Sequence, residues 1–220
     1  MAHIITALTP QKRNRRRVSV YLDGEFAFGL ERIVAAWLQV GQEISEEKIA
    51  QLQAEDGREV AYQQALNLLS YRSHSENEVI QNLREHGVPD ESIEYTVSRL
   101  KDNRLLDDHH FAQAWVENRN EMRPRSRRAL AYELRQRGVD QETIEQSLEA
   151  VDDQKLAYLA ASKKARKFRN SDWKDFRQKM YRFLSQRGFD YEAISQATTR
   201  VWAEVHGDDR PLDEDEEATL

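Results

Sequence analysis

The stretch LRQRGVDQETIEQSLEAV, residues 134–151, is one of three related segments in this chain of 220 residues. The other two are LREHGVPDESIEYTVSRL, residues 83–100, and LSQRGFDYEAISQATTRV, residues 184–201. When the segments are aligned on Gly87, Gly138 and Gly188, they are separated by 51 and 50 residues. Self-similarity at such a period indicates an array of similar small units rather than one large globule.

Apolar residues recur at the same offsets from each glycine, at four and eight residues before it and at six and thirteen after it. They are Val79, Leu83, Ile93 and Leu100; Leu130, Leu134, Ile144 and Val151; and Met180, Leu184, Ile194 and Val201. A spacing of four places apolar side chains on one face of a helix. Glycine suits the left-handed residue after a helix end, and Asp90, Asp140 and Asp190 are placed to cap the helix that follows.

A further helix precedes each segment, at about 59–70, 107–120 and 153–167, so each unit has three helices. Ser75 opens the second helix of the first unit in a capping-box pattern with Glu78, and Ser126 takes the same offset in the second unit. Because Ser171 lies further from its glycine, we expect the second helix of the third unit to be about one turn longer.

The N-terminal region has a different pattern. In RVSVYLDGEFAFGL, residues 17–30, apolar residues alternate on both sides of Asp23-Gly24, a strong two-residue hairpin turn. HIITAL, residues 3–8, can add a third strand, and a helix capped by Ser45 is expected to run to about Asp56. The predicted fold is mainly α, with three tandem three-helix repeats after a small N-terminal β-hairpin or sheet region.

The predicted boundaries divide the chain into five parts. They are an N-terminal β-hairpin with a helical extension at 1–56, repeats at 57–106, 107–152 and 153–206, and an acidic disordered tail at 207–220.

Composition restricts the class of protein. Apolar residues make up 39% and charged residues 33%, which suits thin helical modules with small cores. There is no cysteine, which excludes a disulfide framework, a thiol nucleophile and a cysteine-based zinc site. Since no apolar run is long enough to cross a membrane and no secretory signal is recognisable, we expect a cytoplasmic protein.

Charge is segregated along the chain, although its net value is only −6. Residues 1–17 carry five basic side chains and no acidic one, and residues 123–137 carry six arginines against Glu133. Residues 155–187 carry eleven basic side chains against two acidic ones, whereas residues 208–220 hold seven acids and one arginine. Basic blocks on a neutral body predict a polyanionic partner, and the acidic tail is a candidate internal competitor for it.

The segment DDHHFAQAWVENRNEMRPRSRRALAYELRQRGV, residues 107–139, resembles the RecX family of bacterial regulators of the RecA recombinase. The similar features are an acidic start followed by Phe111-Ala112, then Trp115, the arginine-rich turn, and Leu134 before Gly138. ALNLLSYRSHSENEVIQNLREHGV, residues 65–88, is similar to the first repeat of that family, and VYLDGEFAFGL to the N-terminal extension of its longer members.

This resemblance implies a curved, elongated array of three-helix repeats. It also implies a negative regulator that binds the RecA–single-stranded DNA filament and inhibits its ATPase, strand-exchange and coprotease activities. DNA is expected to be bound weakly or through the filament, and the protein to be a monomer. No cofactor is expected.

Two basic blocks are the candidates for contact with the filament or with DNA, because arginine offers a planar fork of donors that matches phosphate or carboxylate. In the first block, the side chains around Pro124 are expected to be exposed. In the second, a helix with a basic face is expected, with Phe168 packed inward. The candidate residues are Arg123, Arg125, Arg127, Arg128, Lys163, Lys164, Arg166, Lys167, Arg169, Lys174 and Arg177.

Two alternatives remain. The first is a DNA-binding protein of helical-repeat type with no obligatory protein partner, which a sequence pI near 5.6 disfavours; the second is an unrelated helical adaptor. An enzyme is not expected, because the sequence has no nucleotide-binding or nucleophile motif. His109 and His110 follow Asp107 and Asp108, but adjacent helical residues point about 100° apart, so we interpret both as surface residues rather than metal ligands. The aromatic residues Trp115, Trp173, Tyr181 and Phe183 are expected to pack in the cores.

Overall fold

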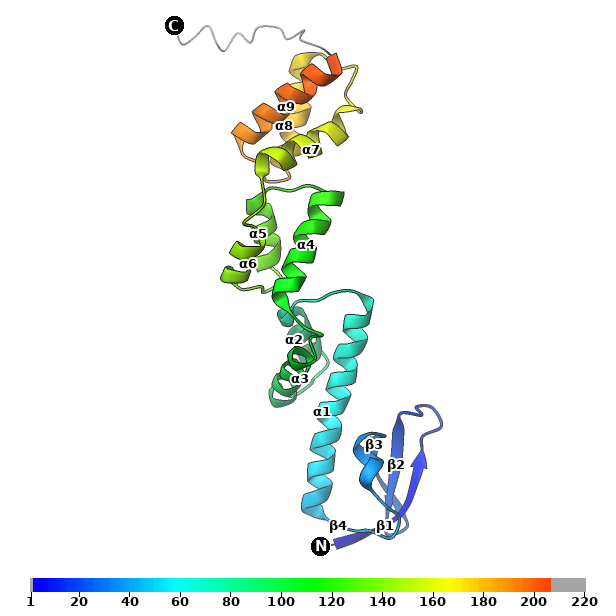
Figure 1. Ribbon diagram of the computed structural model, residues 1–220. Helices are drawn as coiled ribbons and strands as arrows, with labels where there is room; N and C mark the ends of the chain where they lie inside the picture. The colour runs from blue at the N-terminus through cyan, green and yellow to red at the C-terminus, as the bar shows by residue number, and fades with distance from the viewer. Residues whose placement is uncertain (1, 207–220) are drawn as a thin grey trace. The chain divides into compact units, whose positions relative to one another are not determined.

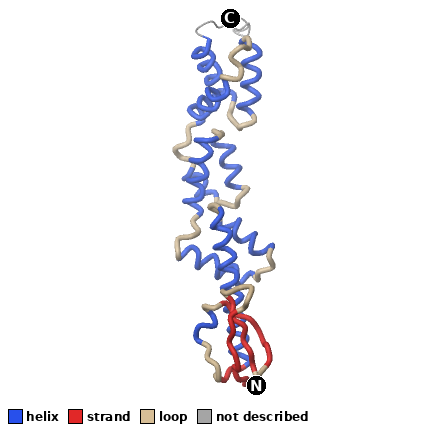
Figure 2. Tube along the Cα trace, turned by 90° about the vertical axis from the view of Figure 1, so that its right-hand side faces the viewer, coloured by secondary structure: helices blue, strands red, loops and turns tan. Residues whose placement is uncertain are grey.

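The structure of the protein is a computed structural model that describes residues 2–206. The chain forms two compact units, one ending at Asp107 and the other beginning at Asp108. Strands occur only in the N-terminal part of the described chain, and the rest is helical (Figures 1 and 2). The predicted mainly α fold, with three three-helix repeats after a small sheet, is confirmed.

The first unit begins with a four-stranded antiparallel sheet in the order β3-β2-β1-β4. The strands are β1 (Ala2–Pro10), β2 (Arg17–Leu22), β3 (Glu25–Glu31) and β4 (Glu43–Ser45). Asp23 and Gly24 have φ angles of +53° and +95°, as the predicted two-residue hairpin turn requires. The stretch after β3 forms only a short 3₁₀ helix, η1 (Val34–Trp37).

The long helix α1 (Glu46–Tyr71) joins the sheet to repeat 1. Ser45 caps it by accepting a hydrogen bond from the Lys48 amide, as expected. The sequence predicts one helix ending near Asp56 and another over 59–70, and this expectation is wrong, because α1 continues through Gly57 for 26 residues. The predicted boundary between residues 56 and 57 therefore falls inside a helix.

Packing on both sides of Gly57 explains the continuity of α1. Leu52, in its first half, belongs to the core under the sheet, whereas Ala61 and Ala65 belong to the core of repeat 1. The carboxylate of Asp56 also accepts a hydrogen bond from Arg17 on β2 at 2.8 Å. These contacts outweigh the roughly 1 kcal/mol by which glycine disfavours a helix interior.

Each repeat has three helices. Repeat 1 consists of the C-terminal half of α1 with α2 (Glu76–Glu85) and α3 (Asp90–Asp102). Repeat 2 consists of α4 (Asp108–Met122), α5 (Arg127–Arg135) and α6 (Gln141–Ser147). Repeat 3 consists of α7 (Asp153–Ala165), α8 (Trp173–Ser185) and α9 (Tyr191–His206).

The apolar stripe predicted from the three segments forms three separate cores. Leu83, Leu134 and Leu184 are each 0% exposed, and each lies in the core of its own repeat. Of the twelve residues of the stripe, Val151 alone is only partly buried; it packs against the cores of both repeat 2 and repeat 3. Gly87, Gly138 and Gly188 have φ angles of +75°, +75° and +88°, which confirms their role after the helix ends.

Some local expectations are wrong. Asp140 and Asp190 accept hydrogen bonds from amides of the following helix, but Asp90 lies inside α3, which Pro89 precedes without a side-chain cap. Helix α8 is longer than α2 and α5, as expected, yet its cap is Asp172 rather than Ser171. Pro89 occupies the extended position before α3 that a capping aspartate would otherwise occupy. Asp90 is therefore the first residue of the helix instead of its cap.

Candidate functional site

The junction of repeats 2 and 3 lies beside the arginine-rich turn between α4 and α5. The end of α8 contacts this turn through backbone groups: the Ser126 amide donates to the Arg187 carbonyl at 3.1 Å. The Arg187 guanidinium in turn donates to the Pro124 carbonyl at 3.0 Å. A Cβ on Gly188 would lie 2.6 Å from Ser126 Oγ, so the left-handed glycine is also required by close packing.

Helix α5 begins at this junction, and two side chains satisfy its first amides. Ser126 Oγ accepts from the Ala129 amide at 3.2 Å, as predicted for its cap. Asp153, from the start of α7, accepts from the Arg127 amide at 2.6 Å. Burial, together with the nearby charges of Asp190 and Asp152, raises the pKa of Asp153, and the hydrogen bond from Arg127 opposes this shift. The backbone that carries the turn is thus held by repeat 3.

Within the described residues, Arg125 is the one arginine of the turn whose side chain forms an ion pair with a carboxylate. Its Nη1 lies 3.0 Å from Glu133 Oε1, and the Glu133 side chain is only 12% exposed. Glu133 also accepts from Arg119 Nε at 2.8 Å and from Trp115 Nε1 at 2.9 Å. Arg125 is half-buried, so the expectation that it is exposed is wrong: a partly buried glutamate on the neighbouring helix draws its side chain inward.

The other three arginines of the turn are exposed. Arg127 and Arg128 stand at the start of α5, and Arg123 follows the end of α4. Arg128 Nη2 reaches the Gly188 carbonyl at 3.5 Å. Among the described residues, none of the three makes an ion pair with a carboxylate.

Helix α7 brings the second basic block to the same place. Lys163 Nζ donates to the Glu121 carbonyl near the end of α4 at 2.6 Å. Lys164 Nζ lies 5.0 Å from the centre of the Phe183 ring, and the Arg187 guanidinium lies 4.4 Å from it. Cations near the face of an aromatic ring are stabilised by its quadrupole, so Phe183 stabilises both charges.

We call the basic side chains around this contact of repeats 2 and 3 the junction surface. They are Arg123, Arg127, Arg128, Lys163, Lys164 and Arg187. Burial, with the positive charges of Arg125 and Arg123, lowers the pKa of Arg187. Guanidinium and ammonium groups so placed can bind phosphate or carboxylate oxygens, but they offer no base for proton transfer.

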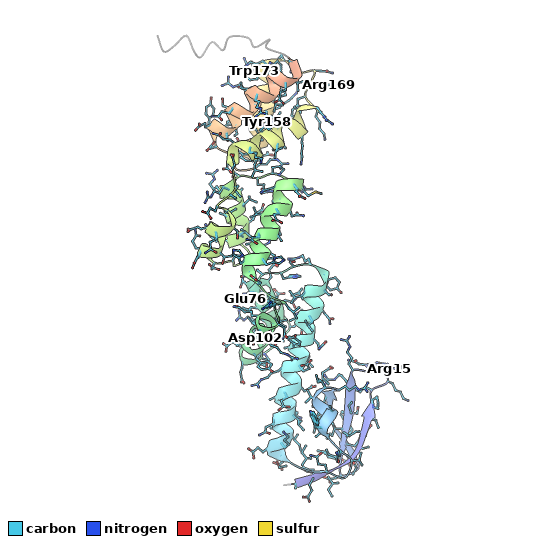
Figure 3. The ribbon with its side chains drawn as sticks, viewed as in Figure 1. Arg15, Glu76, Asp102, Tyr158, Arg169 and Trp173 are labelled. Atoms are coloured by element: carbon cyan, nitrogen blue, oxygen red, sulfur yellow. The ribbon has the colours of Figure 1, made fainter. Side chains whose placement is uncertain are left out.

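The structure does not place the remaining candidates on one helix face. Helix α7 ends at Ala165, two residues before the predicted end, so the stretch with Arg166, Lys167 and Arg169 forms turns beyond it. These three side chains are exposed, as is Lys174 in the first turn of α8, whereas Arg177 is half-buried. Arg169 stands at the α7–α8 connection in Figure 3, and its carbonyl contacts His206 Nε2 at 2.7 Å. Phe168 packs against the core of repeat 3, as expected.

Sequence reasoning missed Arg187 as a member of this surface. The signal was present, because Arg187 directly precedes Gly188, at the position that Arg137 takes before Gly138. Arg137 stacks on Trp115 at 3.7 Å and donates to the Glu133 carbonyl, whereas Arg187 donates to the Pro124 carbonyl of the neighbouring repeat. Only the tertiary structure separates the two roles.

Most of the aromatic candidates pack against the cores, as expected. Trp173 is buried, and Trp115 and Phe183 are partly buried against the cores, but Tyr181 is 48% exposed and contacts Tyr191 instead. His109 and His110 are exposed on α4. Over residues 2–206, no three His, Asp or Glu side chains are grouped to hold a metal ion. No described helix has the length and apolarity needed to cross a bilayer.

Four family models match consecutive parts of the chain. The Regulatory protein RecX N-terminal domain matches residues 3–45. The first, second and third three-helix domains of RecX match residues 61–100, 107–148 and 152–198.

Known proteins match over most of the chain. Regulatory protein RecX of Bacillus pumilus is 31% identical over 98% of this chain and 82% of its own length. The protein of the same name from Bacillus subtilis is 29% identical over 90% of this chain and 76% of its own length.

Two solved structures have a fold similar to that of this chain. A crystal structure of regulatory protein RecX, 27% identical, covers 90% of this chain and 99% of its own with a TM-score of 0.70. A crystal structure of RecX from Lactobacillus salivarius, 23% identical, covers 67% of this chain and 97% of its own with a TM-score of 0.58, and shares the fold. With all four of its domains matched in order, the chain belongs to the RecX family of regulatory proteins.

Proposed function

We propose that this protein binds the RecA–single-stranded DNA filament and inhibits its ATPase, strand-exchange and coprotease activities without catalysing a reaction itself. The regulatory role is common to the relatives, which carry the name Regulatory protein RecX. RecA as the partner, the direction of the effect and action as a cytoplasmic monomer follow from the resemblance of the repeats. DNA is contacted weakly or through the filament.

The junction surface carries the proposal. Its side chains come from two repeats, which are joined by a hydrogen bond from the Ser126 amide to the Arg187 carbonyl and by another from the Arg187 guanidinium to the Pro124 carbonyl. Exposed charges contribute little one at a time, but several that are partly desolvated in one interface can contribute several kcal/mol. A surface that presents cations in a fixed arrangement is suited to the repeating acidic groups of a nucleoprotein filament.

The test variant changes Arg123, Arg127 and Arg128 to Gln, and leaves Arg125 in place because Arg125 pairs with Glu133. We expect helix content and melting to stay near wild type. Inhibition of RecA ATPase on single-stranded DNA should weaken about tenfold or more, equivalent to about 1.4 kcal/mol. The measurement is a titration of ATP hydrolysis at two salt concentrations, with co-sedimentation of the same proteins on the filament.

A matched control removes three charges elsewhere in the same unit. Arg135, Lys155 and Arg182 are exposed and lie outside the candidate set, so their change to Gln should leave inhibition within about twofold. Equal inhibition by the test variant and wild type at both salts would contradict the proposal. Co-sedimentation with naked DNA as strong as with the filament would favour the DNA-binding alternative instead.

A further inference from the structure

A second group of cations lies in the N-terminal unit, on the loop between β1 and β2 and at the end of β3. The side chains are all exposed: Lys12, Arg13, Arg15, Arg16 and Arg32. Figure 3 shows Arg15 at the end of this hairpin. The loop belongs to a part of the protein that the junction surface does not include, and a role for it in nucleic-acid binding rests on the proposed function, which names no site for DNA contact.

Hydrogen bonds hold the loop in a defined shape. The Gln11 amide donates to the Arg17 carbonyl at 2.9 Å, and the Arg16 amide donates to Asn14 Oδ1 at 3.0 Å. The Arg32 amide donates to the Arg16 carbonyl at 2.6 Å, which brings the end of β3 against the loop. The cations are therefore carried by an ordered turn beside a sheet.

The acidic side chains nearest to these five cations pair with other arginines. Glu31 and Asp56 both pair with Arg17, whose pKa these two carboxylates raise although burial opposes the shift. Glu59 pairs with Arg99 at 2.6 Å. Arg16 Nη1 reaches only the neutral amide of Gln63, at 3.4 Å. Within residues 2–206, the five cations have no carboxylate partner.

Two adjoining hollows are lined by these side chains. The larger, of about 540 Å³, is lined by Pro10, Gln11, Lys12, Arg15, Val18 and Arg32. The smaller, of about 330 Å³, is lined by Arg15, Arg16, Arg32 and Ile33, and also by Gln63 and by Glu31 and Glu59, whose carboxylates pair with Arg17 and Arg99. Because Arg15 and Arg32 border both hollows, the two form one basic track rather than a pocket for a single small ion.

We propose that this track binds the sugar–phosphate backbone of a single-stranded nucleic acid. Several guanidinium forks in succession match the repeated phosphates of such a strand. The lining residues include no aromatic side chain and few apolar ones, whereas a protein partner is usually held by buried aromatic or aliphatic anchors. Phosphate contacts need charge and donors alone and carry no base preference.

The test variant changes Lys12, Arg13, Arg15 and Arg16 to Gln in the full-length protein. Its probe is a fluorescently labelled single-stranded oligonucleotide of mixed sequence, as DNA and as RNA, read by anisotropy over a series of salt concentrations without RecA. We expect affinity at low salt to fall at least tenfold. The slope of log affinity against log salt should decrease by about two to three, since each lost phosphate contact to a single strand contributes about 0.7.

Two control proteins make the result specific. The first changes Lys48, Arg84, Lys101 and Arg104, which are exposed in the same unit, to Gln; it should bind nearly as well as wild type. The second changes Arg13, Arg15 and Arg16 to Lys, which keeps the charge and should retain most of the binding. Circular dichroism and melting establish that all variants are folded.

Unchanged affinity and slope in the test variant, or an equal loss in the charge-matched control, would overturn the proposal. So would a variant that binds oligonucleotides normally but inhibits the filament poorly, because the track would then meet an acidic protein surface. Comparison of the DNA and RNA probes identifies which nucleic acid the track prefers. Because RecA is absent from the binding experiment, its outcome can be distinguished from a failure of the proposed inhibition of the filament.

Discussion

The arginines of the turn between α4 and α5 differ in whether they pair with Glu133. Its carboxylate holds Arg125 and Arg119, and both contacts involve partly buried groups. Removing one partner from such a cluster leaves a carboxylate that is neither solvated nor fully bonded, which destabilises the fold. Loss of function in an Arg125 variant would therefore mix stability with recognition, whereas Arg127 and Arg128 can be changed without this effect.

Gly57 provides a prediction for a single residue within α1. A Cβ at this position meets nothing within 4 Å, and its φ angle is not positive. Gly57→Ala should therefore stabilise the first unit by about 0.5–1 kcal/mol, because alanine restricts the unfolded chain and favours the helix. Thermal or urea unfolding measures the change. A loss of stability would mean that the two parts of α1 are not one continuous helix.

Gly188 and Gly87 form a matched pair at equivalent positions of repeats 3 and 1. Both have positive φ, but a Cβ at Gly188 would also lie 2.9 Å from the Ala129 Cβ, whereas Gly87 faces open space. Gly87→Ala should lose about 1 kcal/mol from the left-handed conformation alone, and Gly188→Ala should lose distinctly more. Equal losses in unfolding experiments would contradict the close packing of repeat 3 on the start of α5.

At the scale of the elements, each repeat is stabilised by its own small core. The three cores contain the apolar stripe of their own segment, and Val151 is a residue that two of them share. A helix of 7 to 16 residues is marginal by itself, so the packing of this stripe supplies most of its stability. The segments recur in the sequence because each unit buries the same apolar helix faces in a core of its own.

Leu134 tests the core of repeat 2. It is 0% exposed, so Leu134→Ala should cost about 2–5 kcal/mol through lost burial and the cavity left behind. Tyr132 lies on the same helix and is 60% exposed, and its change to Ala should stay within about 0.5 kcal/mol. Urea unfolding followed by circular dichroism compares the two variants. A small effect at Leu134 would show that the stripe is not the core.

The hairpin turn gives a pH prediction. A hydrogen bond from the Ile4 amide, and then the His3 side chain, lower the pKa of Asp23 below its usual value. An acid with a lowered pKa in the fold stabilises it above the unfolded pKa of about 3.9, and this contribution is lost as pH falls through the folded pKa. Asn tolerates the positive φ of Asp23, so Asp23→Asn removes the charge without disrupting the turn.

The stability difference between wild type and Asp23→Asn should therefore be constant above about pH 5 and shrink toward acid. Protection of sheet amides against hydrogen exchange, corrected for intrinsic rates, measures it locally. A difference that does not vary between pH 3 and 7 would exclude a role for the Asp23 charge.

At the scale of the whole molecule, charge is distributed over separate surfaces. The junction surface and the basic track on the N-terminal sheet lie in different units. The acidic tail predicted at 207–220 lies outside the described residues, so its proposed role rests on sequence alone. Deletion of residues 208–220 removes seven acids and one arginine.

If the tail competes for the basic surfaces, this truncated protein should bind single-stranded DNA more tightly than the full chain at low salt. The difference should shrink as salt rises, because screening weakens both interactions. Anisotropy titrations at several salt concentrations measure it. Equal binding by the two forms would make the tail a passive solubility segment.

The sequence by itself determined the three repeats, their cores and the hairpin turn, because these depend on short-range rules. Apolar spacing sets a helix face, and glycine or Asp-Gly sets a backbone conformation that few other residues adopt. The tertiary structure decided what these rules do not cover. Packing on both sides of Gly57 makes α1 one continuous helix. The partly buried Glu133 pairs with Arg125 and keeps it from being fully exposed. The close packing of Gly188 on Ser126 places Arg187 near Arg123. The continuity of α1 and the position of Arg187 depend on residues far apart in the chain, and the pairing of Arg125 depends on how α4, the turn and α5 pack, so the local pattern could not specify them.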